Sequence, residues 1–167
     1  MENKSKLTIA HLSVYLPFEL KMIFQSRGGR VITLTGVTNQ SNGGATITDG
    51  YGGIWLDSCG FKPILRALDL NKEITHKGET FIPKRKLTDL GIADVYEFEF
   101  NGMDFIYQHE TDFVSDGYGN EFHTLWIPVE NQYKIYQKCF EWMFDMGGLI
   151  AQGLAIDVDS LEDNPYK

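Results

Sequence analysis

The segment VYEFEFNGMDFIYQ, residues 95–108, contains two short runs in which aromatic residues alternate with polar ones. Asn101-Gly102 separates the runs, and this dipeptide between alternating runs is the strongest short-range signal for a two-residue β-hairpin turn. Counting outward from the turn brings six large side chains to one face, in the pairs Phe100 and Met103, Phe98 and Phe105, and Tyr96 and Tyr107. We expect this face to enter the core.

The other face of the predicted hairpin is acidic. The same register places Glu99 opposite Asp104, with Glu97 two residues away. Like charges in such positions destabilise a hairpin by a few tenths to about 1 kcal/mol unless something covers them. Solvent, the chain's own Lys and Arg residues, a basic partner protein and a metal ion are the four alternatives. Glu97, Glu99 and Asp104 are therefore candidate partner-binding residues.

The charges of the whole chain are divided between its halves. Residues 1–88 hold 12 Lys and Arg against 7 Asp and Glu, whereas residues 89–167 hold 3 against 16. No Lys or Arg occurs between Lys86 and Lys134, although ten carboxylates do. Such a block needs a cationic counterpart or extensive hydration. The counterpart could be the basic half of the same chain, a metal ion or a basic surface of another protein.

A candidate basic patch, Lys84-Arg85-Lys86, precedes the acidic block. We expect it to lie in a short helix that begins at Pro83 and ends at Gly91. Cations near a helix N-terminus are disfavoured by the macrodipole, which hints at an acidic partner. A solvated or internally paired surface is the alternative, because three basic residues without interleaved aromatics fall short of a nucleic-acid-binding stripe.

The first third of the chain indicates further β-structure. Apolar and β-branched residues on both sides of residues 27–29 predict a hairpin within residues 17–35, and residues 7–16 favour a short preceding helix. Residues 38–53 are rich in Gly, Asn and Ser, so we expect a loop there around one short strand at residues 45–48. This loop lacks the Lys-Ser/Thr ending of a phosphate-binding P-loop.

Two further segments follow the central hairpin. Residues 109–126 contain acidic residues and glycines in a spacing that does not fit an EF-hand, so we expect a turn-rich connector. Apolar residues at helical spacing then predict a long helix from Pro128 to Gly147-Gly148. The predicted fold is α+β, with an antiparallel sheet built from hairpins and this long C-terminal helix packed on one face. A length of 167 residues indicates a single domain over residues 1–167.

The chemistry-bearing residues form no catalytic constellation. His109 and His123 stand fourteen residues apart without a helix to align them, and no Ser, Thr or Cys lies in a known nucleophile motif. The acidic strands lack the Glu-x-Lys pair of a nuclease-type phosphodiesterase. We therefore expect neither enzyme activity, nor a metal site, nor a cofactor. Cys59 and Cys139 are expected to be buried thiols, since no disulfide framework is present.

Three phrases in the chain resemble the signature phrases of a known family: HLSVYLPFELK near the start, KPILRALDLNKEITHKGETFIP in the middle and FEWMFDMGGLIAQGLAID near the end. With these phrases the chain resembles a family of small uncharacterised proteins encoded by Bacteroidetes phages and prophages. It departs from their pattern at Met143 and at Met146-Gly147, where His and Val-Phe are expected. The resemblance implies a mobile-element protein that works in the cytoplasm of a bacterial host by binding other macromolecules. It implies no specific activity.

Composition separates three classes of function. A non-enzymatic phage or prophage accessory protein would bind a host or phage macromolecule, most simply a basic protein surface, through the acidic surface. A nucleic-acid-associated regulator or replication accessory would need a contiguous basic face. A virion component or an enzyme of unknown reaction is the third alternative. The N-terminus has no apolar run of signal-peptide length and nowhere do about 18 apolar residues run together, so we expect a cytoplasmic protein that does not bind a membrane.

Overall fold

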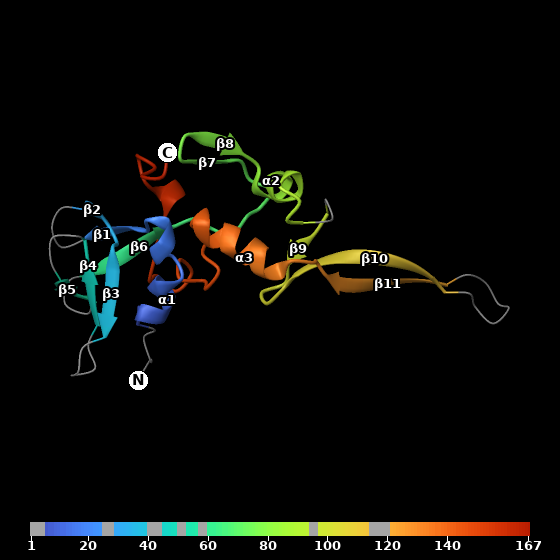
Figure 1. The fold of residues 1–167 in the computed structure, drawn as a ribbon, viewed down its shortest axis with the longest axis horizontal. Coiled ribbons are helices and arrows are strands. Elements are labelled where there is room, and N and C mark those ends of the chain that lie inside the picture. The colour runs from blue at the N-terminus through green and yellow to red at the C-terminus, as the bar shows by residue number, and fades with distance from the viewer. Residues whose placement is uncertain are drawn as a thin grey trace. The chain divides into compact units, whose positions relative to one another are not determined.

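The structure, a computed structural model, describes residues 6–24, 29–39, 45–49, 53–56, 60–93, 97–113 and 121–167. They belong to two compact units (Figure 1). Unit 1 comprises Met1–Asp69, Thr75–Glu79 and Cys139–Lys167, and unit 2 comprises Leu70–Ile74 and Thr80–Lys138. Unit 2 therefore contains Lys84-Arg85-Lys86 together with the whole acidic block. Its six Lys and Arg against eleven Asp and Glu give it a formal net charge of −5.

Strands outnumber helices in the described residues, as expected for an α+β protein. The helices are α1 Ile9–Ser13, α2 Pro83–Asp89 and α3 Gln132–Glu141, with 3₁₀ helices at Leu16–Phe18 and Val158–Ser160. The strands are β1 Lys21–Phe24, β2 Arg30–Thr33, β3 Gly36–Asn39, β4 Ala45–Thr48, β5 Gly53–Trp55, β6 Phe61–Leu65, β7 Ile74–His76, β8 Glu79–Phe81, β9 Glu99–Phe100, β10 Phe105–Phe113, β11 Glu121–Pro128 and β12 Ile156–Asp157.

Unit 1 contains a four-stranded sheet in the order β12-β6-β1-β2. The predicted hairpin within residues 17–35 is confirmed, because β1 and β2 pair antiparallel with Met22 opposite Ile32. β6 adds antiparallel to β1, and β12 adds parallel to β6. The helix expected over residues 7–16 is present but shorter, as α1.

A second sheet of unit 1 has the order β3-β4-β5. The predicted strand at residues 45–48 is confirmed as β4. β3 and β5 enter the predicted loop only at residues 38–39 and 53, where they pair with β4 on its two sides, and residues 40–44 and 50–52 lie outside the described residues. Ile47 of β4 is fully buried, and its burial in the core stabilises the pairing of β4 with β3 and β5. The composition of the segment did not indicate this pairing.

Tyr166 joins the two central strands of the four-stranded sheet. The β1–β6 ladder runs from Phe24 opposite Phe61 to Met22 opposite Pro63. At the next position the Tyr166 hydroxyl accepts a hydrogen bond from the backbone N–H of Lys21 (2.9 Å) and donates one to the carbonyl of Ile64 (2.7 Å). The C-terminus thus satisfies buried backbone groups where direct pairing of the strands stops.

Unit 2 contains a three-stranded sheet in the order β11-β10-β9. The predicted hairpin at residues 95–108 forms, but its register is wrong, because Phe100 faces Phe105 and Glu99 faces Ile106. The predicted opposition of Glu99 and Asp104 therefore does not occur. Residues 94–96 lie outside the described residues, so the predicted pairing of Tyr96 stays a prediction.

The turn of this hairpin is displaced by one residue along the chain. The Asn101 N–H donates to the carbonyl of Asp104 (3.1 Å), and the Asn101 side-chain oxygen accepts from the N–H groups of Met103 (2.9 Å) and Asp104 (2.8 Å). Gly102, with φ +97°, is then the first central residue, a position at which glycine is favoured in a two-residue turn. Met103 leaves the predicted core face and is 74% exposed.

The connector expected over residues 109–126 is largely β-structure. β10 and β11 pair antiparallel from Ile106 opposite Pro128 to Phe113 opposite Glu121, and residues 114–120 lie outside the described residues. The ladder pairs His109 with Leu125 and His123 with Thr111, so the two histidines are not direct partners. The glycines and acidic residues of this segment obscured two strands that are rich in aromatic and β-branched residues.

The N-terminal part of α3 packs against the aromatic face of this sheet. The Tyr136 ring meets Phe105 edge-on at 5.4 Å and Phe100 at 6.2 Å between ring centroids. The Gln132 side chain accepts a hydrogen bond from the Phe105 N–H and donates to the Phe105 carbonyl. Phe98 and Phe105 are buried, so the predicted core face is confirmed for these two residues.

The predicted long C-terminal helix is wrong in length, because α3 ends at Glu141. Met143 adopts a left-handed conformation (φ +64°), its N–H bonds to the carbonyl of Phe140 (3.0 Å), and the Phe144 N–H bonds to the carbonyl of Cys139 (2.8 Å). This pair of bonds is the Schellman arrangement that terminates helices, here with a methionine where glycine is usual. The fully buried Met143 side chain belongs to the core of unit 1, whose packing offsets the backbone strain.

Candidate functional site

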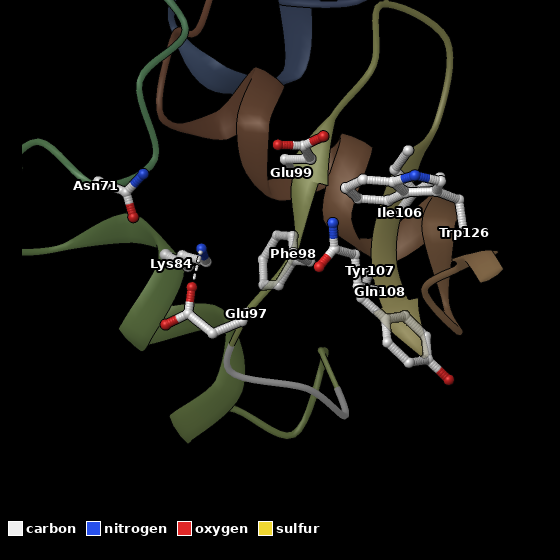
Figure 2. A pocket seen from close by; sticks show the side chains of 9 residues that line it. All are labelled: Asn71, Lys84, Glu97, Phe98, Glu99, Ile106, Tyr107, Gln108 and Trp126. Carbon is white, nitrogen blue, oxygen red and sulfur yellow. Dashed lines mark hydrogen bonds and ion pairs between the residues drawn. The ribbon is translucent and has the colours of Figure 1, made fainter. Parts of the chain in front are cut away.

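Unit 2 has an open pocket of about 340 Å³ at its three-stranded sheet (Figure 2). Strand pairing places Glu99 of β9, Gln108 of β10 and Trp126 of β11 on one face, since Glu99 is opposite Ile106 and Gln108 is opposite Trp126. The lining consists of Asn71, Lys84, Glu97, Phe98, Glu99, Ile106, Tyr107, Gln108 and Trp126. The pocket thus combines aromatic rings with carboxylates, amides and one amine.

Lys84 lines one side of the pocket. Its Nζ forms an ion pair with Glu97 at 3.0 Å and lies 5.4 Å from the centroid of the Phe98 ring. The Lys84 side chain is only 12% exposed, whereas that of Glu97 is 92% exposed. The internal pairing considered for the acidic residues is therefore confirmed for Glu97. Because Glu97 is so exposed, we expect this pair to contribute little to stability.

Helix α2 carries the three residues of the candidate basic patch. α2 forms where predicted, with Pro83 at its first position and Gly91, at φ +64°, just after its end. Its three cations have different surroundings. Lys84 is bound in the pocket, Arg85 is exposed, and Lys86 lies over the Phe81 ring at 5.6 Å.

The candidate acidic residues are brought together only in part. Glu97 and Glu99 both line the pocket, but Asp104 does not and lies at the end of the hairpin turn. Glu99 is exposed and has no ion-pair partner among the residues that the structure describes. One carboxylate of the pocket is thus neutralised by Lys84 and a second is not.

Trp126 and Gln108 are two of the pocket residues that sequence reasoning did not assign to a site. Trp126 is 49% exposed although it is a large aromatic side chain on a strand. The alternation within EFHTLWIP, residues 121–128, was the signal that could have identified its strand. An exposed tryptophan in a concave site is typical of a recognition surface, where it contributes a large contact area.

The polar lining of the pocket consists of carboxylates, amides, one amine and one phenol. Its described lining contains no Ser, Thr, Cys or His side chain. No cluster of three or more His, Cys, Asp or Glu side chains that could hold a metal ion occurs within the described segments. The same segments include no helix with the length and apolar character needed to span a bilayer.

In unit 1, burial shifts the pKa of four ionisable side chains. Burial raises the pKa of the Tyr15 and Tyr166 hydroxyls, and it raises the pKa of the Cys139 thiol to about 12. Burial also lowers the pKa of Arg66, which is opposed by the negative charge of Asp159. Arg66 donates to the carbonyls of Trp142 (3.1 Å) and Thr75 (2.8 Å), and these hydrogen bonds compensate for its burial. Cys139 is a buried free thiol as predicted, and Cys59 lies outside the described residues.

The raised pKa of Cys139 predicts a loss of stability in alkali. The thiol titrates near 9.0 when unfolded and at about 12 when folded, so above pH 9 the unfolded chain releases a proton that the folded chain keeps. Between about pH 8 and about pH 10 we expect the wild type to lose about 1 kcal/mol more of its free energy of unfolding than Cys139→Ala does. Guanidinium chloride unfolding at both pH values measures this. Equal losses in the two proteins would contradict burial of the thiol.

Comparison of the chain with protein-family models, with curated proteins and with solved structures gives no match. The resemblance to proteins of Bacteroidetes phages and prophages therefore stays a prediction.

Proposed function

We propose that this chain is a non-enzymatic accessory protein of a phage or prophage that binds a basic protein through the acidic surface of unit 2. We define the acidic surface as Glu97, Glu99 and Asp104. The observation that carries the proposal is the pocket, in which the exposed Trp126 and the unpaired Glu99 share one concave site. Such a combination of an aromatic anchor with uncompensated charge suits a partner of opposite charge.

The charge distribution around the pocket supports a protein partner over a nucleic acid. Unit 2 has a net charge of −5, and Lys84, the first residue of the basic patch, is already paired with Glu97. A nucleic-acid-binding face would place several unpaired cations along one surface to neutralise phosphates. A carboxylate surface repels phosphates and accelerates the encounter with a basic protein. The bacterial cytoplasm is the proposed site of action, on the resemblance to phage and prophage proteins.

The test is capture from a Bacteroidetes lysate at low salt by the wild type and by the triple variant Glu97→Gln, Glu99→Gln, Asp104→Asn. We expect the wild type to retain a basic protein and the triple variant to lose most of it, with the difference shrinking as salt is added. The free energy of unfolding should change by no more than about 1 kcal/mol, because the Lys84–Glu97 pair is exposed on one side.

The chain offers a matched control for this test. Glu130→Gln, Glu162→Gln, Asp163→Asn changes net charge by the same amount at three exposed residues outside the pocket. Retention should be nearly unchanged in this control. Equal retention by the wild type and the acidic-surface variant contradicts the proposal. Equal losses in both triple variants contradict it as well, because net charge alone would then account for capture.

A further inference from the structure

The pocket in unit 2 already contains one bound cation. Lys84 is seated between the Glu97 carboxylate (3.0 Å) and the Phe98 ring (5.4 Å to its centroid), and its side chain is mostly removed from solvent. A carboxylate and an aromatic face together stabilise an ammonium or guanidinium group through charge pairing and cation–π attraction. The contacts of Lys84 therefore indicate that this surface binds cationic groups.

The same two kinds of group occur a second time in the pocket. Glu99 supplies the carboxylate and Trp126 supplies the ring, and strand pairing places both on the same sheet face as Gln108. In Figure 2, Lys84 and Glu97 lie on one side of the Phe98 ring, and Trp126 lies on the other. Neither Glu99 nor Trp126 has a cationic partner among the residues that the structure describes.

We propose that Glu99, Trp126 and Gln108 bind the guanidinium group of an arginine side chain on the basic partner protein. This inference rests on the proposed function and specifies what the partner presents. We refer to these three residues as the arginine seat. A guanidinium is planar and carries donors in its plane, so it can stack on the Trp126 indole while it donates to the Glu99 carboxylate. The Gln108 amide oxygen offers a further acceptor.

The dimensions and charge of the pocket fit one long side chain. About 340 Å³ is near the lower limit for small-molecule sites, which suits a single inserted side chain better than a folded peptide. With Lys84 and Glu97 neutralising each other, Glu99 leaves the pocket with one uncompensated negative charge. One arginine would neutralise it. A lysine ammonium is more strongly hydrated and cannot stack as a plane, so it should bind more weakly.

The experiment is a titration of the full chain with N-acetyl-arginine methylamide, followed by the NMR signal of the Trp126 indole N–H. Trp126→Phe assigns that signal among the three tryptophans. We expect a saturable shift with a dissociation constant on the order of millimolar, as befits one side chain. The citrulline analogue, which has the same shape without charge, should give no shift. The lysine analogue should bind about threefold or more weakly.

Variants test the residues of the arginine seat. Glu99→Gln should weaken arginine binding about tenfold, because it removes the charged acceptor. Glu130→Gln, an exposed residue outside the pocket, should leave arginine binding unchanged. The inference is overturned if the Trp126 signal does not shift up to about 50 mM probe. The inference is also overturned if the citrulline or the lysine analogue binds the wild type as tightly as the arginine probe does. It is overturned too if Glu99→Gln binds the arginine probe as tightly as the wild type does.

The capture assay separates this inference from the proposed function. Trp126→Leu keeps the charge of unit 2 and should still reduce retention of the basic partner, whereas Tyr133→Leu, at a 72% exposed aromatic residue outside the pocket, should not. If the acidic-surface variant loses its partner while Trp126→Leu keeps it, the arginine seat is refuted and the proposed function stands. If arginine binds as described but no basic protein is captured, the proposed function is refuted and the seat remains a guanidinium site.

Discussion

Replacing Phe105 with alanine is expected to lower the free energy of unfolding of unit 2 by about 3–5 kcal/mol. Phe105 is fully buried and its ring contacts those of Phe98 (6.1 Å), Phe100 (5.0 Å) and Tyr136 (5.4 Å between centroids). Truncation would leave a cavity that three rigid rings cannot fill without moving β9. Guanidinium chloride unfolding followed by circular dichroism, with hydrogen exchange of the β10 amides, measures the effect.

Met103→Ala is the control for this prediction, and it also tests the register of the hairpin. Met103 lies in the turn and is 74% exposed, so its removal should change stability by less than about 0.5 kcal/mol. The alternative two-residue turn at Asn101-Gly102 would place Met103 on the core face, where its loss would cost several times more. Comparable losses in Phe105→Ala and Met103→Ala would contradict the observed register.

The packing of Phe105 also affects the position of Glu99 in the pocket. β9 is only two residues long and is held to β10 by pairs that include Phe100 with Phe105. Glu99 belongs to this short strand, and strand alternation places it on the sheet face opposite Phe100 and Phe105. We therefore expect Phe105 to position Glu99 without touching a ligand.

Replacing Asp145 with alanine is expected to destabilise unit 1 by about 3–5 kcal/mol, because hydrogen bonds to a charged group contribute about 1.5–3 kcal/mol each. The buried Asp145 carboxylate accepts hydrogen bonds from the N–H groups of Leu149 (2.8 Å) and Ile150 (2.7 Å). Alanine would leave both donors without this acceptor. Asp145→Asn retains one carbonyl oxygen, so its free energy of unfolding should fall between those of the wild type and Asp145→Ala, as measured by denaturant unfolding.

Asp157→Ala provides a matched comparison in the same unit. Asp157 also accepts a hydrogen bond from a backbone N–H, that of Asp159 at 3.1 Å, but this bond is exposed to solvent. Loss of such a cap costs about 1 kcal/mol. If Asp145→Ala were no more destabilising than Asp157→Ala, burial would not be what makes the Asp145 contacts important.

Local patterns in the sequence predicted several elements correctly. The β1–β2 hairpin, strand β4 and helix α2 each depend on residues within a few positions, such as the Pro83 and Gly91 that bound α2. β7 and β8 pair as a separate two-stranded sheet, and this hairpin was missed although it is local. Its turn, Lys77-Gly78, has positive φ at both residues, and lysine is a weaker signal for that conformation than asparagine.

The candidate site was predicted in its charges but not in its shape. Glu97 and Glu99 were identified from alternation, whereas Trp126 and Gln108 reach the pocket through β11 and β10, whose pairing is a long-range contact. Lys84 was assigned to a separate basic patch, and only folding brings it to Glu97, thirteen residues further along the chain.

By itself, the sequence determined the β1–β2 hairpin, strand β4, helix α2, the burial of Phe98 and Phe105 and the acidic character of unit 2, because these follow from neighbouring residues and from composition. Tertiary structure decided the hairpin register, the end of α3 and the pocket. The Gln132 side chain binds the backbone of Phe105 and fixes its place, and the burial of Met143 offsets the left-handed conformation that ends the helix. In each case the deciding energy comes from burial or hydrogen bonding between groups distant in sequence, which no local pattern contains.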